Sequence, residues 1–217
     1  MTSELLIRAP GRFAVKIIVQ MFADLRTALR RAGTVFGSAA LALTGLLAGP
    51  AHADASLPVF VPYPSGWSPN YTVFPYNLWQ SRVTPEMVNA ERDACQWFNA
   101  QYDTLSAQSW GFQRGLHDNS DSWDGVQGAG DVLKANLDQS AAFLDPRVHT
   151  LYITNYPDQS QYSPLYNGDS FFHLWYQLTQ ISDKIAHRVP SGVINANNAT
   201  MKVYGDVIRD SGVCNGA

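Results

Sequence analysis

The amino-acid sequence predicts an all-α fold: a bundle of about four main helices, closed by one disulfide and preceded by an extended arm. Three observations lead to this prediction. Apolar residues recur at helical spacing along four separate segments. Only two cysteines occur, and they lie in the first helical segment and just after the last one. A segment rich in proline and aromatic residues comes before the first helical segment.

The first 53 residues read as a secretory signal with a long leader. An uncharged apolar run, residues 35–49, follows three arginines and ends in Ala51-His52-Ala53, the small-x-small pattern that signal peptidase recognises. The run is shorter than the roughly 20 residues that a membrane span needs. Cleavage after Ala53 is therefore favoured over anchoring, and the mature chain, 54–217, is expected to be secreted or held in the cell envelope without a membrane span. Met21 opens a conventional signal and is an alternative translation start.

The negative charge of the mature chain disfavours some classes of partner. Residues 54–217 contain 9 Lys and Arg against 16 Asp and Glu, a net charge of −7 before histidine is counted. An acidic chain is a poor match for nucleic acid or an anionic lipid surface. All six Trp and all ten Tyr also lie in this part of the chain, so the mature domain is rich in aromatic side chains.

Residues 54–83 are expected to form an extended arm laid over the helical domain. Prolines at 58, 62, 64 and 75 oppose both helix and central strand. The low charge of the segment argues against a disordered tail. The arm aromatics can either seal the bundle or form a contact surface for a partner, and the candidates for that surface are Trp67, Tyr71, Phe74, Tyr76 and Trp79.

The helical domain, 84–217, begins with a strong start signal. Thr84 is a good N-cap, Pro85 suits the first helical position, and Glu86 faces the positive end of the helix dipole. The helix is expected to run to about Gly115. Its apolar stripe contains Val88, Cys95, Phe98, Tyr102, Leu105, Phe112 and Leu116.

A loop over 117–130, rich in Asp, Ser and Gly, separates this helix from the next. The second helix is expected over 131–144, where Leu133, Leu137, Ala141 and Leu144 are in register. Asp145-Pro146 should end it and can start another turn. The segment 148–156 suits a short helix or a strand equally well.

Two more helices complete the expected bundle. Asp169 or Ser170 should cap a helix that stops before Pro190, and a last helix should span 195–211. The seam of the third helix contains Phe171, Leu174, Trp175, Leu178, Ile181 and Ile185, and the face of the last contains Met201, Tyr204 and Ile208.

The two cysteines, Cys95 and Cys214, are expected to form a structural disulfide. The chain is directed to an oxidising compartment, where paired cysteines are the rule. A reactive thiol or a metal ligand would need partners at C-x-x-C or similar spacing, and the sequence has none.

Known catalytic signatures are missing from the sequence. It lacks G-x-S-x-G, H-E-x-x-H and a glycine-rich phosphate loop. The mature histidines are scattered, and no two of them share an i, i+4 face that could hold a metal. The acidic loop with Asp118, Asp121 and Asp124 lacks the EF-hand pattern, so a solvated loop that caps neighbouring helix ends is favoured over a calcium site. We therefore expect no metal, no cofactor and no catalytic residues.

Short motifs resemble a small family of secreted mycobacterial proteins. The matching residues are Leu165-Tyr166-Asn167-Gly168-Asp169, followed by Phe172 and Trp175, the terminal Val213-Cys214-Asn215-Gly216, and Ala94-Cys95 with the helix through Tyr102. They cover about a third of the mature chain. The resemblance implies a compact helical protein cinched by one disulfide, and a characterised relative is required for siderophore secretion. The arm and residues 119–146 depart from the family pattern. The resemblance implies a role only for Cys95 and Cys214.

The leading functional prediction is an exported, non-enzymatic accessory protein of the cell envelope. It would act by contact with an envelope protein such as a transporter, or with a siderophore or another small apolar molecule. One alternative is a secreted hydrolase without a linear motif, using Asp side chains with His117 or His173. Another is a structural protein of the envelope.

Overall fold

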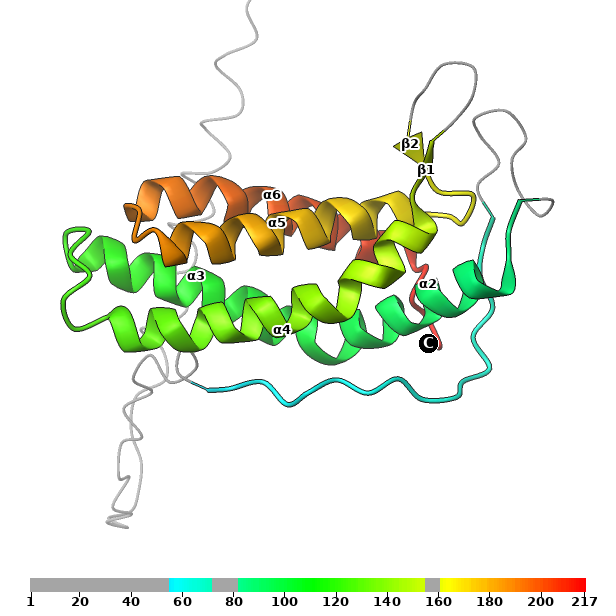
Figure 1. Cartoon of the computed structure of the whole chain (residues 1–217), viewed down its shortest axis with the longest axis horizontal. Coiled ribbons are helices and arrows are strands. Elements are labelled where there is room, and N and C mark those ends of the chain that lie inside the picture. Colours follow the sequence, from blue (N-terminus) through cyan, green and yellow to red (C-terminus); the bar gives the residue numbers. More distant parts are fainter. Residues whose placement is uncertain (1–54, 72–81, 155–160) are drawn as a thin grey trace, which may run out of the picture. The chain divides into compact units, whose positions relative to one another are not determined.

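The computed structural model describes residues 55–71, 82–154 and 161–217, and all of them belong to one compact unit, Ala48–Ala217. The predicted secretory signal and Met21 lie outside the described residues. Four helices pack together in an all-α architecture, as the sequence predicts (Figure 1). None of the helices in the described part of the chain combines the length and apolar character needed to cross a membrane.

The first helix begins where the sequence places it. Thr84 is the N-cap of α2 (Pro85–Trp97), its side chain accepts a hydrogen bond from the Met87 amide at 3.3 Å, and Pro85 opens the helix. The helix then widens into a π-helical segment, η1 (Phe98–Tyr102), and continues as α3 (Asp103–Asp118). The sequence analysis did not predict the π-helical segment. π-helical segments are rare in proteins, and many of those that occur lie at functional sites.

The second helix is longer than predicted. The helix α4 (Gln127–Leu151) starts before residue 131 and continues through Pro146, so the prediction that Asp145-Pro146 ends it is wrong. Proline removes one backbone hydrogen bond, but the turn beyond it buries Val148 and Leu151 completely. Burying each such side chain contributes about 1.5–3 kcal/mol, which offsets the roughly 3 kcal/mol that an interior proline costs.

The segment 148–156, for which helix and strand were equally suitable, contains both helix and strand among its described residues. The helix ends at Leu151, and the strand β1 (Ile153–Thr154) pairs antiparallel with β2 (Gln161–Tyr162). The next helix, α5 (Gly168–Ala186), is capped by Asn167 in the left-handed conformation (φ 63°), rather than by Asp169 or Ser170. A β-carbon at Gly168 would meet the Ser163 hydroxyl oxygen at 2.2 Å, so the tight turn before α5 requires glycine.

The last helix, α6 (Ser191–Ser211), starts directly after Pro190, four residues before the predicted 195. Its early start has a long-range cause. The Asp121 carboxylate, on the loop after α3, accepts a hydrogen bond from the Ser191 amide at 2.8 Å and so caps α6 from another part of the chain.

One core unites the four helices, of which the first is the continuous run of α2, η1 and α3. The helix α5 packs against α4 and α6, α3 packs against α6, and α2 packs against α4. The predicted seam residues lie inside this core, except that Val88, Trp175 and Tyr204 are only partly buried. The Cys95–Cys214 disulfide is present, with an S–S distance of 2.10 Å and a sequence separation of 119. It ties α2 to the chain that follows α6.

Candidate functional site: an amide-bound arm over a cavity

The described part of the arm, residues 55–71, runs along α2, α3 and α4 without helix of its own (Figure 1). Its main chain is bound by amide side chains of the helices, which we call the amide row. The row consists of Gln96 on α2, Gln101 on η1, Gln108 on α3, and Asn136 and Gln139 on α4. All but Gln139 are at least nine-tenths buried.

The hydrogen bonds of the amide row are short and reach main-chain atoms along the arm. Gln96 both accepts from the Tyr63 amide (3.0 Å) and donates to the Tyr63 carbonyl (2.8 Å). Asn136 accepts from the Leu57 amide at 2.9 Å. Gln101 and Gln139 both donate to one carbonyl, that of Pro58, at 2.6 and 2.9 Å. The carbonyl of Ala55 likewise accepts two such bonds, from Gln108 (2.8 Å) and Asn136 (3.0 Å).

Two of the predicted contact residues also lie against the helical domain. The Trp67 ring is partly buried on the main core, and its indole N–H donates to the Val213 carbonyl at 2.8 Å. Tyr71 forms an isolated antiparallel bridge with Leu165. The other three, Phe74, Tyr76 and Trp79, lie outside the described residues. Whether any of the five contacts a partner remains a prediction.

A cavity of about 290 Å³, the arm pocket, opens between the arm and the helices. The arm contributes one wall, and the helices α2, η1 and α4 contribute the others. Its lining residues are Val59, Phe60, Trp97, Gln101, Gln139, Ser140, Ala142 and Phe143. Small-molecule sites are typically about 300–1,000 Å³ and largely apolar with a few polar groups, so the arm pocket is at the small end of that range.

Three lining residues carry polar atoms with no hydrogen-bond partner among the described residues: the Trp97 indole nitrogen, the Gln101 carbonyl oxygen and the Ser140 hydroxyl. Each of these residues is at most 5% exposed. Leaving a buried polar group unsatisfied costs about 1–3 kcal/mol, so such groups normally find a partner, either water or a ligand. Together they offer a donor, an acceptor and a hydroxyl that can serve as either.

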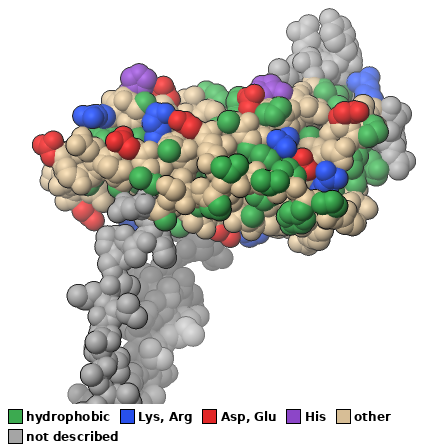
Figure 2. Space-filling view, turned by 60° about the horizontal axis from the view of Figure 1, so that its bottom comes forward, with side chains coloured by type: hydrophobic (Ala, Val, Ile, Leu, Met, Phe, Trp, Pro, Cys, Tyr) green, Lys and Arg blue, Asp and Glu red, His purple; other side chains and the backbone are tan. Residues whose placement is uncertain are grey.

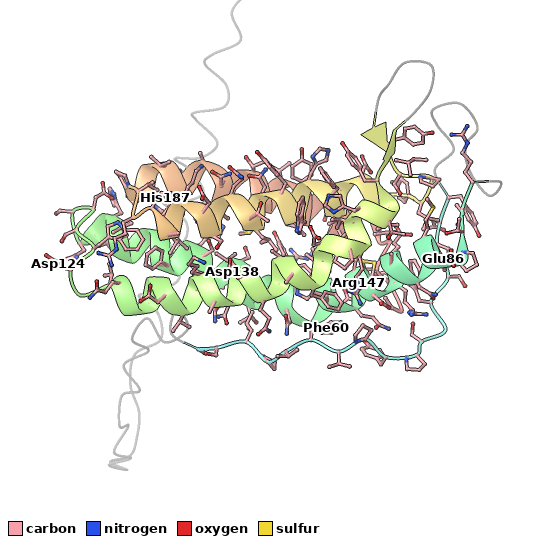
Figure 3. The ribbon with its side chains drawn as sticks, viewed as in Figure 1. Phe60, Glu86, Asp124, Asp138, Arg147 and His187 are labelled. Carbon is pink, nitrogen blue, oxygen red and sulfur yellow. A yellow bond between two sulfur atoms is a disulfide. The ribbon has the colours of Figure 1, made fainter. Side chains whose placement is uncertain are left out.

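Two aromatic residues of the pocket, Phe60 and Phe143, contact each other, and Arg147 packs against the Phe143 ring. Phe60 of the arm meets Phe143 edge to face, with ring centroids 5.0 Å apart. The Arg147 guanidinium lies 3.7 Å from the Phe143 ring centroid and pairs with Asp93 of α2 at 3.1 Å. Phe60 and Arg147 lie close together in Figure 3, on the arm side of α4. Figure 2, turned so that this side comes forward, shows hydrophobic side chains gathered together with several Lys and Arg side chains.

The candidate residues of the hydrolase alternative lie elsewhere. His173 stacks on Tyr204 (ring centroids 4.8 Å apart) and belongs to a surface cluster of rings with Tyr152, Phe172, His149 and Trp175. His117 is exposed in the last turn of α3. Within residues 55–71, 82–154 and 161–217, no group of three or more His, Cys, Asp or Glu is arranged to hold a metal ion.

The acidic loop caps a helix end, as predicted. Hydrogen bonds from Ser191 lower the pKa of the Asp121 carboxyl, which keeps the cap charged at neutral pH. The loop is also held by Trp123, whose indole N–H donates to the Val189 carbonyl at 3.3 Å. Asp124 and His187 lie toward the same end of the bundle in Figure 3.

A buried carboxyl lies in α2, apart from the arm pocket. Glu91 is fully buried, and neither of its carboxyl oxygens has a hydrogen-bond partner in the described part of the chain. Burial raises the pKa of Glu91 well above its usual value, and the negative charge of Asp169 raises it further. The carboxyl is therefore expected to stay protonated at pH values where an exposed glutamate is ionised.

The sequence analysis did not identify the amide row or the arm pocket. One signal was readable: Trp97, Gln101 and Gln108 are spaced by four and seven residues, and Asn136, Gln139 and Phe143 by three and four. Each set therefore lies on one helix face, beside the apolar stripe. These faces bind the main chain of the arm, and main-chain groups are the same at every residue, so the side chains of the arm did not predict this contact.

Comparisons with known proteins add no relative: the chain matches no protein-family model, no curated protein and no solved structure. The resemblance to secreted mycobacterial proteins therefore stays a prediction that rests on the short motifs alone.

Proposed function

We propose that this protein is an exported, non-enzymatic binding protein that holds a small, mainly apolar molecule in the arm pocket. The observation that carries the proposal is one largely apolar cavity lined by three residues, Trp97, Gln101 and Ser140, that each have a buried polar atom without a partner among the described residues. A matching ligand would accept a hydrogen bond from the Trp97 indole and donate one to the Gln101 carbonyl. The role agrees with an accessory protein of the cell envelope that supports the export of a small apolar molecule.

The π-helical turn supports the same reading. Gln101 lies in η1, and its amide nitrogen is already used by the Pro58 carbonyl at 2.6 Å. Its carbonyl oxygen is buried and has no partner among the described residues. π-helical segments are rare, and those found inside α-helices frequently lie at functional sites.

The first test measures binding of a neutral apolar fluorophore, N-phenyl-1-naphthylamine, which carries one N–H donor. Ala142→Trp should fill the pocket, because Ala142 lines it from α4. Ala135→Trp is the matched control, since Ala135 is also an exposed alanine of α4 but does not line the cavity. We expect saturable binding to the unmodified protein and to Ala135→Trp, and a loss of about tenfold or more in Ala142→Trp. Equal binding to all three proteins would contradict the proposal.

The second test identifies the natural ligand. Protein purified from the culture medium without denaturation should release a small molecule, detectable by mass spectrometry. The same molecule should accompany Ala135→Trp and be depleted from Ala142→Trp. A clear enzymatic turnover that depends on His117 or His173 would instead favour the hydrolase alternative.

A further inference from the structure

We infer that the surface beneath the arm is a binding groove for an extended, uncharged polypeptide segment of a partner protein, and that residues 55–67 occupy it within the same chain. This inference is independent of the proposed small-molecule ligand. It rests on how the amide row holds the arm.

The amide row contacts main-chain atoms, which every polypeptide offers. Ala55, Leu57, Pro58 and Tyr63 are all bound through backbone N–H or C=O groups. Bonds of this kind fix the path and direction of an extended chain without selecting its side chains. Recognition of extended peptides by main-chain hydrogen bonds, with pockets for individual side chains, is a recurrent mode of peptide binding.

The arm covers the amide row almost completely. Gln96 is completely buried, and Gln108 and Asn136 are 1% and 3% exposed. Asn136 in turn donates to the Gln108 side chain at 2.9 Å, which holds both amides in place. An amide needs several hydrogen bonds when buried, and with the arm in place the extended main chain supplies them.

The arm itself indicates the chemistry of a competing segment. Residues 55–71 carry no charged side chain, and prolines at 58, 62 and 64 favour an extended conformation. Leu57 and Phe60 point to the core, whereas Val59 and Val61 are 74% and 72% exposed. A partner segment therefore needs two inward apolar side chains at matching positions, no charge, and free backbone groups between its prolines.

The test uses a fluorescein-labelled peptide with the sequence of residues 55–67 and the full exported protein. An intramolecular arm competes at an effective concentration of the order of millimolar, so the peptide should bind the unmodified protein weakly. Leu57→Asp places a charge at an inward position of the arm and leaves every groove residue unchanged. Val61→Asp is the matched control, because it introduces the same charge on the outward face. We expect the peptide to bind Leu57→Asp at least about tenfold more tightly than Val61→Asp.

The peptide chemistry then tests main-chain recognition. N-methylation at the Leu57 and Tyr63 positions removes the N–H groups that Asn136 and Gln96 accept from. It should weaken binding about tenfold or more, as should Gln96→Leu in the protein. Without any substitution in the protein, excess peptide should accelerate hydrogen exchange at the arm amides of Leu57 and Tyr63. Absence of saturable binding to Leu57→Asp together with unchanged arm exchange, or equal affinity of the N-methylated peptide, would overturn the inference.

Discussion

The buried carboxyl of Glu91 should make the protein less stable as the pH rises above about 4.5, and Glu91→Gln should remove that dependence. The native pKa is raised by burial and by Asp169, whereas the unfolded chain has the ordinary value of about 4.3. Between these two values the native state binds more protons than the unfolded state. Stability therefore falls with rising pH until the native pKa is passed.

The magnitude follows from linkage. One group that is protonated in the native state and ionised in the unfolded state lowers the free energy of unfolding by about 1.4 kcal/mol per pH unit. The wild-type protein loses stability at up to this rate over the interval between the unfolded pKa and the raised native pKa. Below the unfolded pKa both states are protonated, and the contribution of Glu91 no longer changes with pH.

The assay is urea unfolding of the disulfide-intact protein at pH 4 to 8, comparing Glu91→Gln with the wild type. Glu86→Gln is the control in the same helix. Glu86 is exposed, and its hydrogen bond with Thr84 lowers its pKa, so its stabilising effect is present at neutral pH and lost as the pH falls. Glu91→Gln should gain relative to the wild type from pH 5 to pH 7. The stability difference for Glu86→Gln should stay constant over that range, because the contribution of Glu86 is complete above about pH 5 and is lost only at lower pH. A stability difference for Glu91→Gln that is flat from pH 5 to 8 would refute the reasoning.

Two further predictions concern the closure and packing of the bundle. Cys214→Ser opens the 119-residue loop and should lower the free energy of unfolding by about 2–5 kcal/mol in urea titrations; ready alkylation of both thiols in the native wild-type protein would contradict this. Gly205→Ala in α6 would place a methyl group 1.9 Å from the Tyr102 hydroxyl, which donates to the Met201 carbonyl, so thermal unfolding should show a loss of about 1–3 kcal/mol. Gly192→Ala, in the same helix with open space around it, should be neutral or slightly stabilising.

Helix positions could be predicted where their signals are local. Thr84 and Pro85 start α2 with groups that belong to the helix itself, and the structure confirms that start. The start of α6 could not be predicted as well, because its cap, Asp121, comes from a loop 70 residues away in sequence. A cap of that kind becomes visible only when the packing is known.

The run of α4 through Pro146 shows a second limit of local signals. Proline is read as a helix end because it removes a hydrogen bond within its own turn. The compensation comes from the burial of Val148 and Leu151, which depends on α2 and on the segment before α5. The lost hydrogen bond at Pro146 can be predicted from the sequence, whereas the burial of Val148 and Leu151 becomes visible only in the packed core.

The arm pocket and the groove beneath the arm have two residues in common, Gln101 and Gln139, and this makes their occupancy interdependent. Gln101 binds the Pro58 carbonyl with its nitrogen and also lines the cavity, while Val59 and Phe60 of the arm supply a wall of that cavity. A partner segment that displaces the arm therefore also replaces the wall. If both proposals hold, a ligand that requires Phe60 must oppose displacement of the arm, and by thermodynamic reciprocity displacement must weaken that ligand by the same factor. A partner segment that takes the place of the arm would therefore act as a release step for the bound ligand.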